Sequence, residues 1–326
     1  MKEIDHFLTG QVERHKTPSV QYLVFNQDHM IHRFQLGFAD ILNQIPASDK
    51  TTYNAYSATK TFTALSVLQL AQQKKIDIYQ PVKNYLAEFP YPPAITVKQL
   101  MTHSAGIPNP VPLNWIHLSD EHQTFDRNSF FKKVFLKNSK VKSKPNEKFA
   151  YSNPGYFLLG QLIEKISGVS YEEYVRENII KPLNLTADEL DFTTGSQQHA
   201  KGYHNKVSLS YFILGLFINR HQYFGKVEGK WKPFKNNYVN GAAYGGLIGT
   251  PHAFAKYLQE FLKPDSKLVP DDFKHLLFTE NRTVSNKPTG MCLSWFSGHL
   301  NGNRYYSHAG GGGGYYCEIR VYPERG

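Results

Sequence analysis

Few cysteines and no long apolar run restrict what this 326-residue chain can be. Its two cysteines, Cys292 and Cys317, are too few for a disulfide-stapled fold, and neither lies in a CxxC pair or a His-rich metal pattern. The longest apolar stretch, 209–218, has about half the residues that a bilayer-spanning helix needs. We therefore expect no transmembrane segment and interpret the cysteines as small buried residues in late strands.

The N-terminus also lacks the marks of a secretory signal. Residues 1–6 contain no apolar core and no small-residue cleavage site. Taken as it stands, the sequence predicts a cytoplasmic protein. If an export signal was removed upstream, the protein would be exported or periplasmic.

The net charge of the chain is positive, and the basic residues are scattered along the sequence. The formal net charge is +10, from 37 basic and 27 acidic residues, and such a surplus attracts anionic partners. The densest basic run, Lys132–Lys148, holds seven basic residues, but no nucleic-acid-binding motif surrounds it. We interpret the charge as a solvated basic surface and predict no nucleic-acid partner.

Residue periodicity places strands at both ends of the chain and helices between them. Expected helices cover 4–16, 58–74, a start near 96, 155–167 and 171–179, and expected strands cover 20–25, 31–39, 292–296, 304–308 and 315–322. This order predicts an α+β fold in which a sheet carries an inserted helical lobe.

The first chemical signal is Ser57-Ala58-Thr59-Lys60, where a loop becomes the strongest helix. The i, i+3 spacing puts Ser57 and Lys60 on one face of that helix, so the amine can reach the hydroxyl. Serine needs a neighbouring base, and lysine can be one if desolvation lowers its pKa. The alternative is a capping serine and a surface lysine, because SxxK is common by chance.

Two further signals are weak by themselves. Tyr151-Ser152-Asn153 offers a phenol for proton transfer and an amide for a substrate carbonyl, although a turn with a capping serine is the commoner explanation of such a tripeptide. His308-Ala309-Gly310 ends a strand in five glycines, Gly310–Gly314, and glycine there lets a ligand approach the backbone. The alternative is a glycine-rich hairpin.

Together these motifs resemble one family. The segments that carry the resemblance are Tyr56–Ala64, Leu100–Pro108, Phe149–Tyr156, Gly245–Pro251 and His308–Gly310. In this order they are similar to class C β-lactamases, penicillin-binding DD-peptidases and related esterases, over nearly the whole chain. The resemblance implies a five-stranded antiparallel sheet flanked by helices. It also implies a sheet lobe (1–78 and 240–326) and a mainly helical lobe (79–239), with the active site between them.

The same resemblance implies a role for each site residue, and a reaction that needs no metal or organic cofactor. The roles are Ser57 as nucleophile, Lys60 and Tyr151 for proton transfer, Asn153, His308, Ala309 and Gly310 for substrate binding, and the N–H groups of Ser57 and Gly311 as oxyanion hole. The segment 102–106 around His103 lacks the first glycine of a GxSxG motif, so we interpret His103 as a structural histidine.

His308 stands where true β-lactamases carry a lysine. Histidine is largely neutral at pH 7, so a fixed charge for a substrate carboxylate is weakened. We therefore expect a serine hydrolase that cuts a small ester, amide or peptide through an acyl-enzyme. The alternatives are a penicillin-binding DD-carboxypeptidase, a class C-like β-lactamase that takes β-lactams, or a non-catalytic penicillin-binding sensor.

Two segments have no assigned role. The apolar run 211–217 suits core packing, an acyl chain or a membrane surface, and core packing is the simplest interpretation.

Family members usually continue past the strand that contains Cys317–Val321 with another strand and a helix. That strand is therefore expected to be an exposed edge here.

Overall fold

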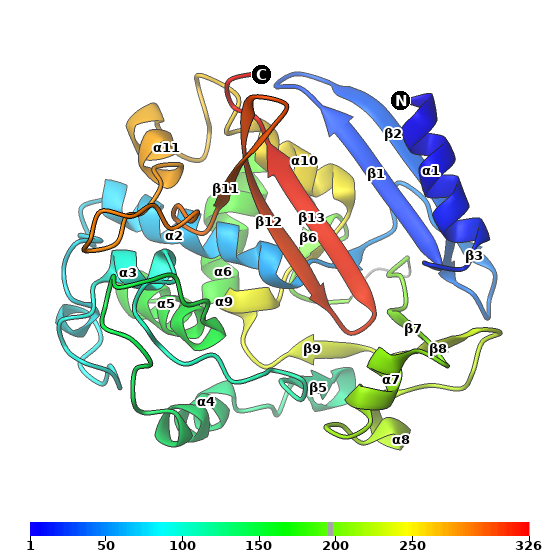
Figure 1. Ribbon diagram of the computed structural model, residues 1–326, viewed down its shortest axis with the longest axis horizontal. Helices are drawn as coiled ribbons and strands as arrows, with labels where there is room; N and C mark the ends of the chain where they lie inside the picture. The colour runs from blue at the N-terminus through cyan, green and yellow to red at the C-terminus, as the bar shows by residue number, and fades with distance from the viewer. Residues whose placement is uncertain (195–197, 326) are drawn as a thin grey trace.

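The computed structural model describes residues 1–194 and 198–325 and confirms the α+β class. Antiparallel strands from the two ends of the chain lie together on one side, and most helices lie on the other (Figure 1). In the described residues no helix is both long and apolar enough to cross a bilayer.

The elements follow the expected order. The helices are α1 (Lys2–Glu13), α2 (Thr59–Gln72), α3 (Val97–Met101), α4 (Arg127–Lys137), α5 (Asn153–Ser167), α6 (Tyr171–Val175), α7 (Leu209–Leu214), α8 (Arg220–Tyr223), α9 (Ala242–Gly245), α10 (Pro251–Gln259) and α11 (Asp271–Leu277). The strands are β1 (Ser19–Phe25), β2 (Met30–Asp40), β3 (Ile45–Pro46), β4 (Tyr53–Asn54), β5 (Ile116–Leu118), β6 (Leu190–Asp191), β7 (Tyr203–Asn205), β8 (Trp231–Pro233), β9 (Asn237–Val239), β10 (Ile248–Gly249), β11 (Phe296–Leu300), β12 (Asn303–Gly312) and β13 (Tyr315–Val321).

The expected single sheet of five strands is wrong in detail. Among the described residues, the main strands form two three-stranded sheets, β1-β2-β3 and β11-β12-β13, each antiparallel. The two sheets do not pair, because a cavity of about 1600 Å³ separates β1 from β13 and is lined by both strands. The edge of β13 therefore faces this cavity.

Helix α2 is the centre of the molecule. Every residue from Thr59 to Leu70 is buried, which is typical of a helix surrounded by protein rather than one with a solvent face. It packs against α5, α6, α9 and α11, and Phe62 stacks on Tyr257 of α10 with ring centroids 3.8 Å apart. Any polar side chain on α2 near its start is therefore removed from water.

Capping residues set where the neighbouring helices begin. The Ser152 hydroxyl accepts a hydrogen bond from the Gly155 N–H at 3.1 Å, so α5 begins at Asn153, and Gly168 at φ 80° ends it. Thr96 and Gln99 form a reciprocal capping box at the start of α3. The expected start of α3 near Thr96 and the end of α5 at Gly168 are confirmed, whereas α5 begins at Asn153, two residues before the expected 155, because Ser152 caps it. This start determines how residues 151–153 are presented.

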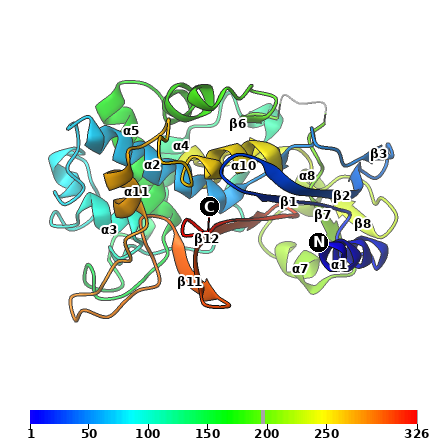
Figure 2. The same ribbon diagram turned by 90° about the horizontal axis from the view of Figure 1, so that it is seen from above.

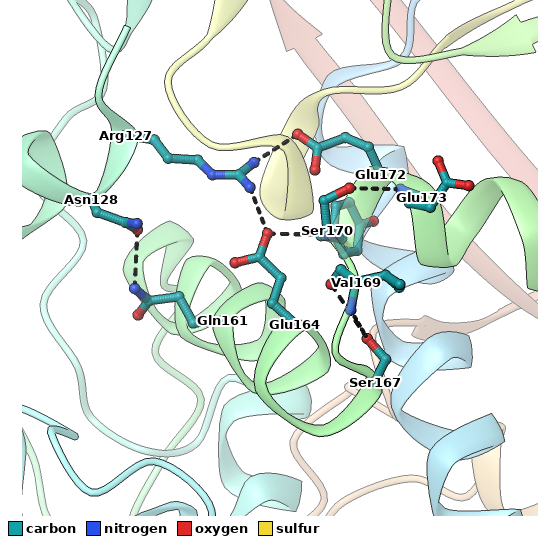
Figure 3. Close-up of polar contacts among 10 residues, drawn as sticks. Arg127, Asn128, Gln161, Glu164, Ser167, Val169, Ser170, Glu172 and Glu173 are labelled. Atoms are coloured by element: carbon teal, nitrogen blue, oxygen red, sulfur yellow. Dashed lines mark hydrogen bonds and ion pairs between the residues drawn. The ribbon is translucent and has the colours of Figure 1, made fainter.

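One arginine connects three helices of the helical side (Figure 3). The Arg127 guanidinium at the start of α4 contacts Glu164 of α5 at 2.5 Å and Glu172 of α6 at 2.7 Å. Glu164 also accepts the Tyr171 N–H at 3.1 Å. All three charged side chains are mostly buried, so the pairs gain more than fully exposed ones and hold α5 in place.

Strand β12 approaches the 3₁₀ turn Tyr56–Ala58 so closely that one position requires glycine. A β-carbon on Gly310 would lie 1.9 Å from the Ala55 carbonyl oxygen and 3.0 Å from the Ser57 nitrogen. At Gly311, a β-carbon would lie 3.7 Å from the Tyr316 ring and 3.8 Å from the Tyr315 carbonyl oxygen, both ordinary contact distances. The absence of a side chain at Gly310 thus allows the strand to lie against the Ser57 turn.

This contact predicts a difference between two adjacent glycines. Gly310→Ala should lower the free energy of unfolding by about 1–3 kcal/mol, because the backbone must move to relieve the overlap. Gly311→Ala, the matched control, should change it by no more than about 0.5 kcal/mol. Urea unfolding of both variants measures this, and equal midpoints would show that the close approach does not matter.

Candidate active site

Ser57 and Lys60 lie at the junction of the 3₁₀ turn and α2. The Lys60 Nζ lies 3.1 Å from the Ser57 Oγ and donates a second hydrogen bond to the Tyr244 carbonyl oxygen at 2.7 Å. Tyr56, just before the serine, has a left-handed backbone with φ 45°, which is unfavourable for a bulky residue. The turn thus places the Ser57 hydroxyl within hydrogen-bond distance of the Lys60 amine.

Lys60 is buried without a counter-charge. Its side chain has no exposed surface, and the ion pairs of the described residues do not include it. The rings of Tyr151, Tyr156 and Tyr244 surround the Nζ, with centroids 4.9, 5.5 and 5.6 Å away. Burial disfavours the ammonium form and holds the pKa of Lys60 well below its ordinary value.

Tyr151 is held in place by His103. Their ring centroids are 4.2 Å apart, and the His103 Nδ1 accepts the backbone N–H of Ser152 at 3.0 Å. The His103 carbonyl accepts the N–H of Ala150 at 2.7 Å, so the histidine binds the chain on both sides of the tyrosine. Burial lowers the pKa of His103 well below its ordinary value, so the ring is neutral.

The Tyr151 hydroxyl stays protonated at neutral pH. Burial raises the pKa of Tyr151 above its ordinary value, and a hydrogen bond with the Ser57 side chain only partly offsets this. A phenolate is thus disfavoured next to Ser57, whereas a neutral Lys60 amine is favoured there. Between the two groups, the amine is the better proton acceptor.

His308 completes the polar cluster from the side of β12. Its side chain is almost fully buried, its ring centroid lies 6.4 Å from that of Tyr151, and its Nδ1–H donates to the Ala309 carbonyl at 2.8 Å. Burial and the nearby Lys60 lower the pKa of His308 to about 3. This histidine therefore carries no charge at pH 7.

The cavity between β1 and β13 extends to Ser57. Its lining includes Ser57, Asn153, Trp115 and Tyr244, but not Lys60, which lies behind the serine. Asn153 is buried, and its Oδ1 has no hydrogen-bond partner among the described residues. A buried amide oxygen without a partner is costly, so Asn153 offers a vacant acceptor to a molecule in the cavity.

The structure brings together the predicted residues around one serine. Ser57, Lys60, Tyr151 and His308 are connected by the contacts above, Asn153 and Gly311 line the same cavity, and Gly310 packs on the Ser57 turn. Ala309 is exposed on β12 between the buried His308 and Gly310, as expected for alternating strand residues.

Sequence reasoning missed the Tyr244 carbonyl that accepts a hydrogen bond from Lys60 and the Tyr156 ring beside it. Tyr156 ends one of the recognised motifs, and Tyr244 directly precedes the motif 245–251. Their roles depend on burial and backbone geometry, which no residue pattern records. Adjacency to the motifs was the only available signal.

Several known proteins are similar to this chain in sequence. Protein flp of Staphylococcus aureus (strain N315) is 27% identical over 210 residues, which are 62% of this chain and 41% of flp. Penicillin-binding protein 4* of Bacillus subtilis (strain 168) is 24% identical over 297 residues, which are 88% of this chain and 61% of that protein. The chain thus spans about half the length of the curated relatives it matches.

Solved structures show the same fold. The octameric penicillin-binding protein homologue from Pyrococcus abyssi superposes with a TM-score of 0.80 at 24% identity, covering 99% of this chain and 71% of that one. The D-amino acid amidase from Ochrobactrum anthropi SV3 superposes with a TM-score of 0.69 at 17% identity, covering 95% and 85%. The beta-lactamase family model matches residues 4–326, and the chain therefore belongs to the beta-lactamase family.

Proposed function

We propose that this protein is a serine hydrolase that cleaves a small ester or amide through an acyl-enzyme on Ser57. The observation that carries the proposal is the Lys60 amine, buried without a counter-charge 3.1 Å from the Ser57 Oγ. A neutral amine at hydrogen-bond distance is what a serine needs to lose its proton during attack.

The acylation step assigns a role to each neighbouring group. The Ser57 Oγ attacks the substrate carbonyl carbon while its proton passes to the Lys60 Nζ. The negative charge that forms on the carbonyl oxygen is stabilised by the N–H groups of Ser57 and Gly311. When the tetrahedral intermediate collapses, the bond to the leaving group breaks, and the proton moves from Lys60 through the Tyr151 hydroxyl to that group.

Deacylation runs the same path with water. A water molecule attacks the ester carbon, its proton goes to Lys60, and the Ser57 oxygen leaves and recovers a proton. Asn153 provides its side-chain amide to position the substrate, since the residue lines the cavity and its buried Oδ1 has no partner among the described residues. No step uses His308 as an acid or base, because its pKa of about 3 keeps it neutral.

The neutral His308 also favours one substrate class. A β-lactam carries a carboxylate, and a buried uncharged imidazole gives it no ion-pair partner. We therefore infer that substrates without a carboxylate at that position are preferred over β-lactams. A D-amino acid amidase from Ochrobactrum anthropi shares the fold, and we therefore include amides among the proposed substrates.

Replacing the nucleophile should abolish turnover without unfolding the protein. We expect Ser57→Ala to lower kcat/KM for p-nitrophenyl acetate and butyrate by about 10⁴-fold or more, because no other described group is placed to attack. Ser66→Ala is the control, since Ser66 is a fully buried serine on α2 whose hydroxyl, among the described residues, bonds to the Phe62 carbonyl and not to Lys60. Retained turnover in Ser57→Ala with a normal circular dichroism spectrum would refute the proposal.

The pH dependence should report Lys60 and not His308. Activity requires the neutral amine, so kcat/KM should rise as pH rises through the lowered pKa of Lys60 and reach its plateau well below pH 10.5. His308 loses its proton near pH 3, so His308→Asn should leave the position of this rise unchanged. A rise that disappears in His308→Asn would assign the base to the histidine instead.

A further inference from the structure

Helix α7 and the turn after it present a set of large apolar side chains to solvent. We call this set the α7 patch, and it consists of Val207, Leu209, Phe212, Ile213, Leu216 and Phe217. The exposed fraction of the residue is 61% for Phe212 and 70% for Leu216. Figure 2 shows α7 at the periphery of the molecule, away from the central helices.

The patch is not a loosely packed part of the core. The opposite side of α7 bears Tyr211 and Leu214, which pack on a small separate cluster of Ile218, Phe224 and Phe234. This cluster supports the helix from beneath and leaves the α7 patch facing outward. The simplest interpretation of the run 211–217, core packing, is therefore wrong for Phe212, Ile213, Leu216 and Phe217.

Positive charge surrounds the α7 patch in the chain. Between residues 202 and 240 lie six cations, Lys206, Arg220, Lys226, Lys230, Lys232 and Lys235. The same stretch has a single carboxylate, Glu228, which is buried and bonded to Lys201 and Tyr203. Lys206, Lys226, Lys230 and Lys235 are exposed, so the exposed charge that this segment itself contributes is positive.

The helix also has its C-terminal carbonyl groups satisfied internally. The Arg220 Nη2 donates to the carbonyl oxygen of Phe212 at 2.9 Å and to that of Tyr211 at 3.4 Å. Backbone groups must be paired before a segment enters an apolar medium, because water is not available there. Arg220 thus pairs two of the last carbonyl groups of this short helix.

We propose that the α7 patch docks the protein on an anionic lipid bilayer. Apolar side chains would enter the boundary between headgroups and acyl chains while the lysine ammonium groups contact anionic headgroups. An acidic protein partner would bind the same cations. It would have no need of six exposed apolar side chains that do not form an aromatic pocket. The lipid surface matches both features at once.

Docking would also have a consequence for the candidate active site. Ile213 and Leu214 line the cavity that extends to Ser57, so the docking helix is part of the cavity wall. A bilayer bound at α7 would lie beside the route to the serine. This consequence rests on the proposed function, whereas the docking itself does not.

Vesicle binding tests the proposal directly. We expect the full chain to cosediment with phosphatidylcholine vesicles that contain 30% phosphatidylglycerol at least ten-fold better than with pure phosphatidylcholine. The double variant Phe212→Ser/Phe217→Ser should bind the anionic vesicles at least ten-fold more weakly, although its charge is unchanged. Because the protein carries a charge of +10, this charge-neutral variant separates docking from general attraction.

The control is Leu136→Ser/Val284→Ser, which removes two apolar side chains elsewhere that are more exposed than Phe212 and Phe217, and it should bind like the wild type. Phe212→Trp adds a readout of insertion, because brominated lipid should quench the new indole. Equal binding by all variants, or no quenching, would overturn the proposal. So would self-association through the α7 patch in the absence of lipid binding. Ser57→Ala should still dock, so failure of docking and failure of hydrolysis are distinguishable.

Discussion

The burial of one lysine without a counter-charge determines how the candidate site works. Taking an ammonium out of water costs several kcal/mol unless a partner compensates, and a lysine responds by giving up its proton. Here the compensation is limited to the Tyr244 carbonyl, the Ser57 hydroxyl and the faces of three tyrosine rings. The pKa of Lys60 falls in consequence, and the side chain becomes a base.

The rest of the fold maintains this burial. Helix α2 is enclosed by α5, α6, α9 and α11, so Lys60 cannot turn toward solvent. Strand β12 closes the site from the other side, and the missing side chain at Gly310 lets it lie against the Ser57 turn. His103 secures Tyr151 through hydrogen bonds on both sides of it. Each device lowers the local polarity around the lysine or fixes a group next to it.

The sequence allowed the α+β class, the cluster of site residues and several helix boundaries to be predicted, because these depend on local signals. SxxK spacing predicts that Ser57 and Lys60 share a helix face, and Ser152 and Gly168 mark the ends of α5. The roles assigned to these residues, and the division into a sheet lobe and a helical lobe, stay predictions.

The features that the sequence did not reveal depend on packing between residues that lie far apart in the chain. The separation of β1 from β13 by a cavity has no counterpart in any local pattern, and the single five-stranded sheet was expected from the family resemblance. The exposure of Phe212 and Phe217 was missed for a similar reason, since an apolar run does not show which of its faces finds a partner. The Tyr244 carbonyl is a backbone group and leaves no trace in residue identity.

The central claim is that Ser57 becomes covalently acylated. Mixing the protein with a slowly hydrolysed p-nitrophenyl ester, quenching in acid and measuring the intact mass tests it most directly. The account predicts one acyl group per chain, located on the peptide that contains Ser57, which disappears as the ester is turned over. An acyl group on another residue, or turnover without any acylated protein under conditions that trap it, would contradict the account.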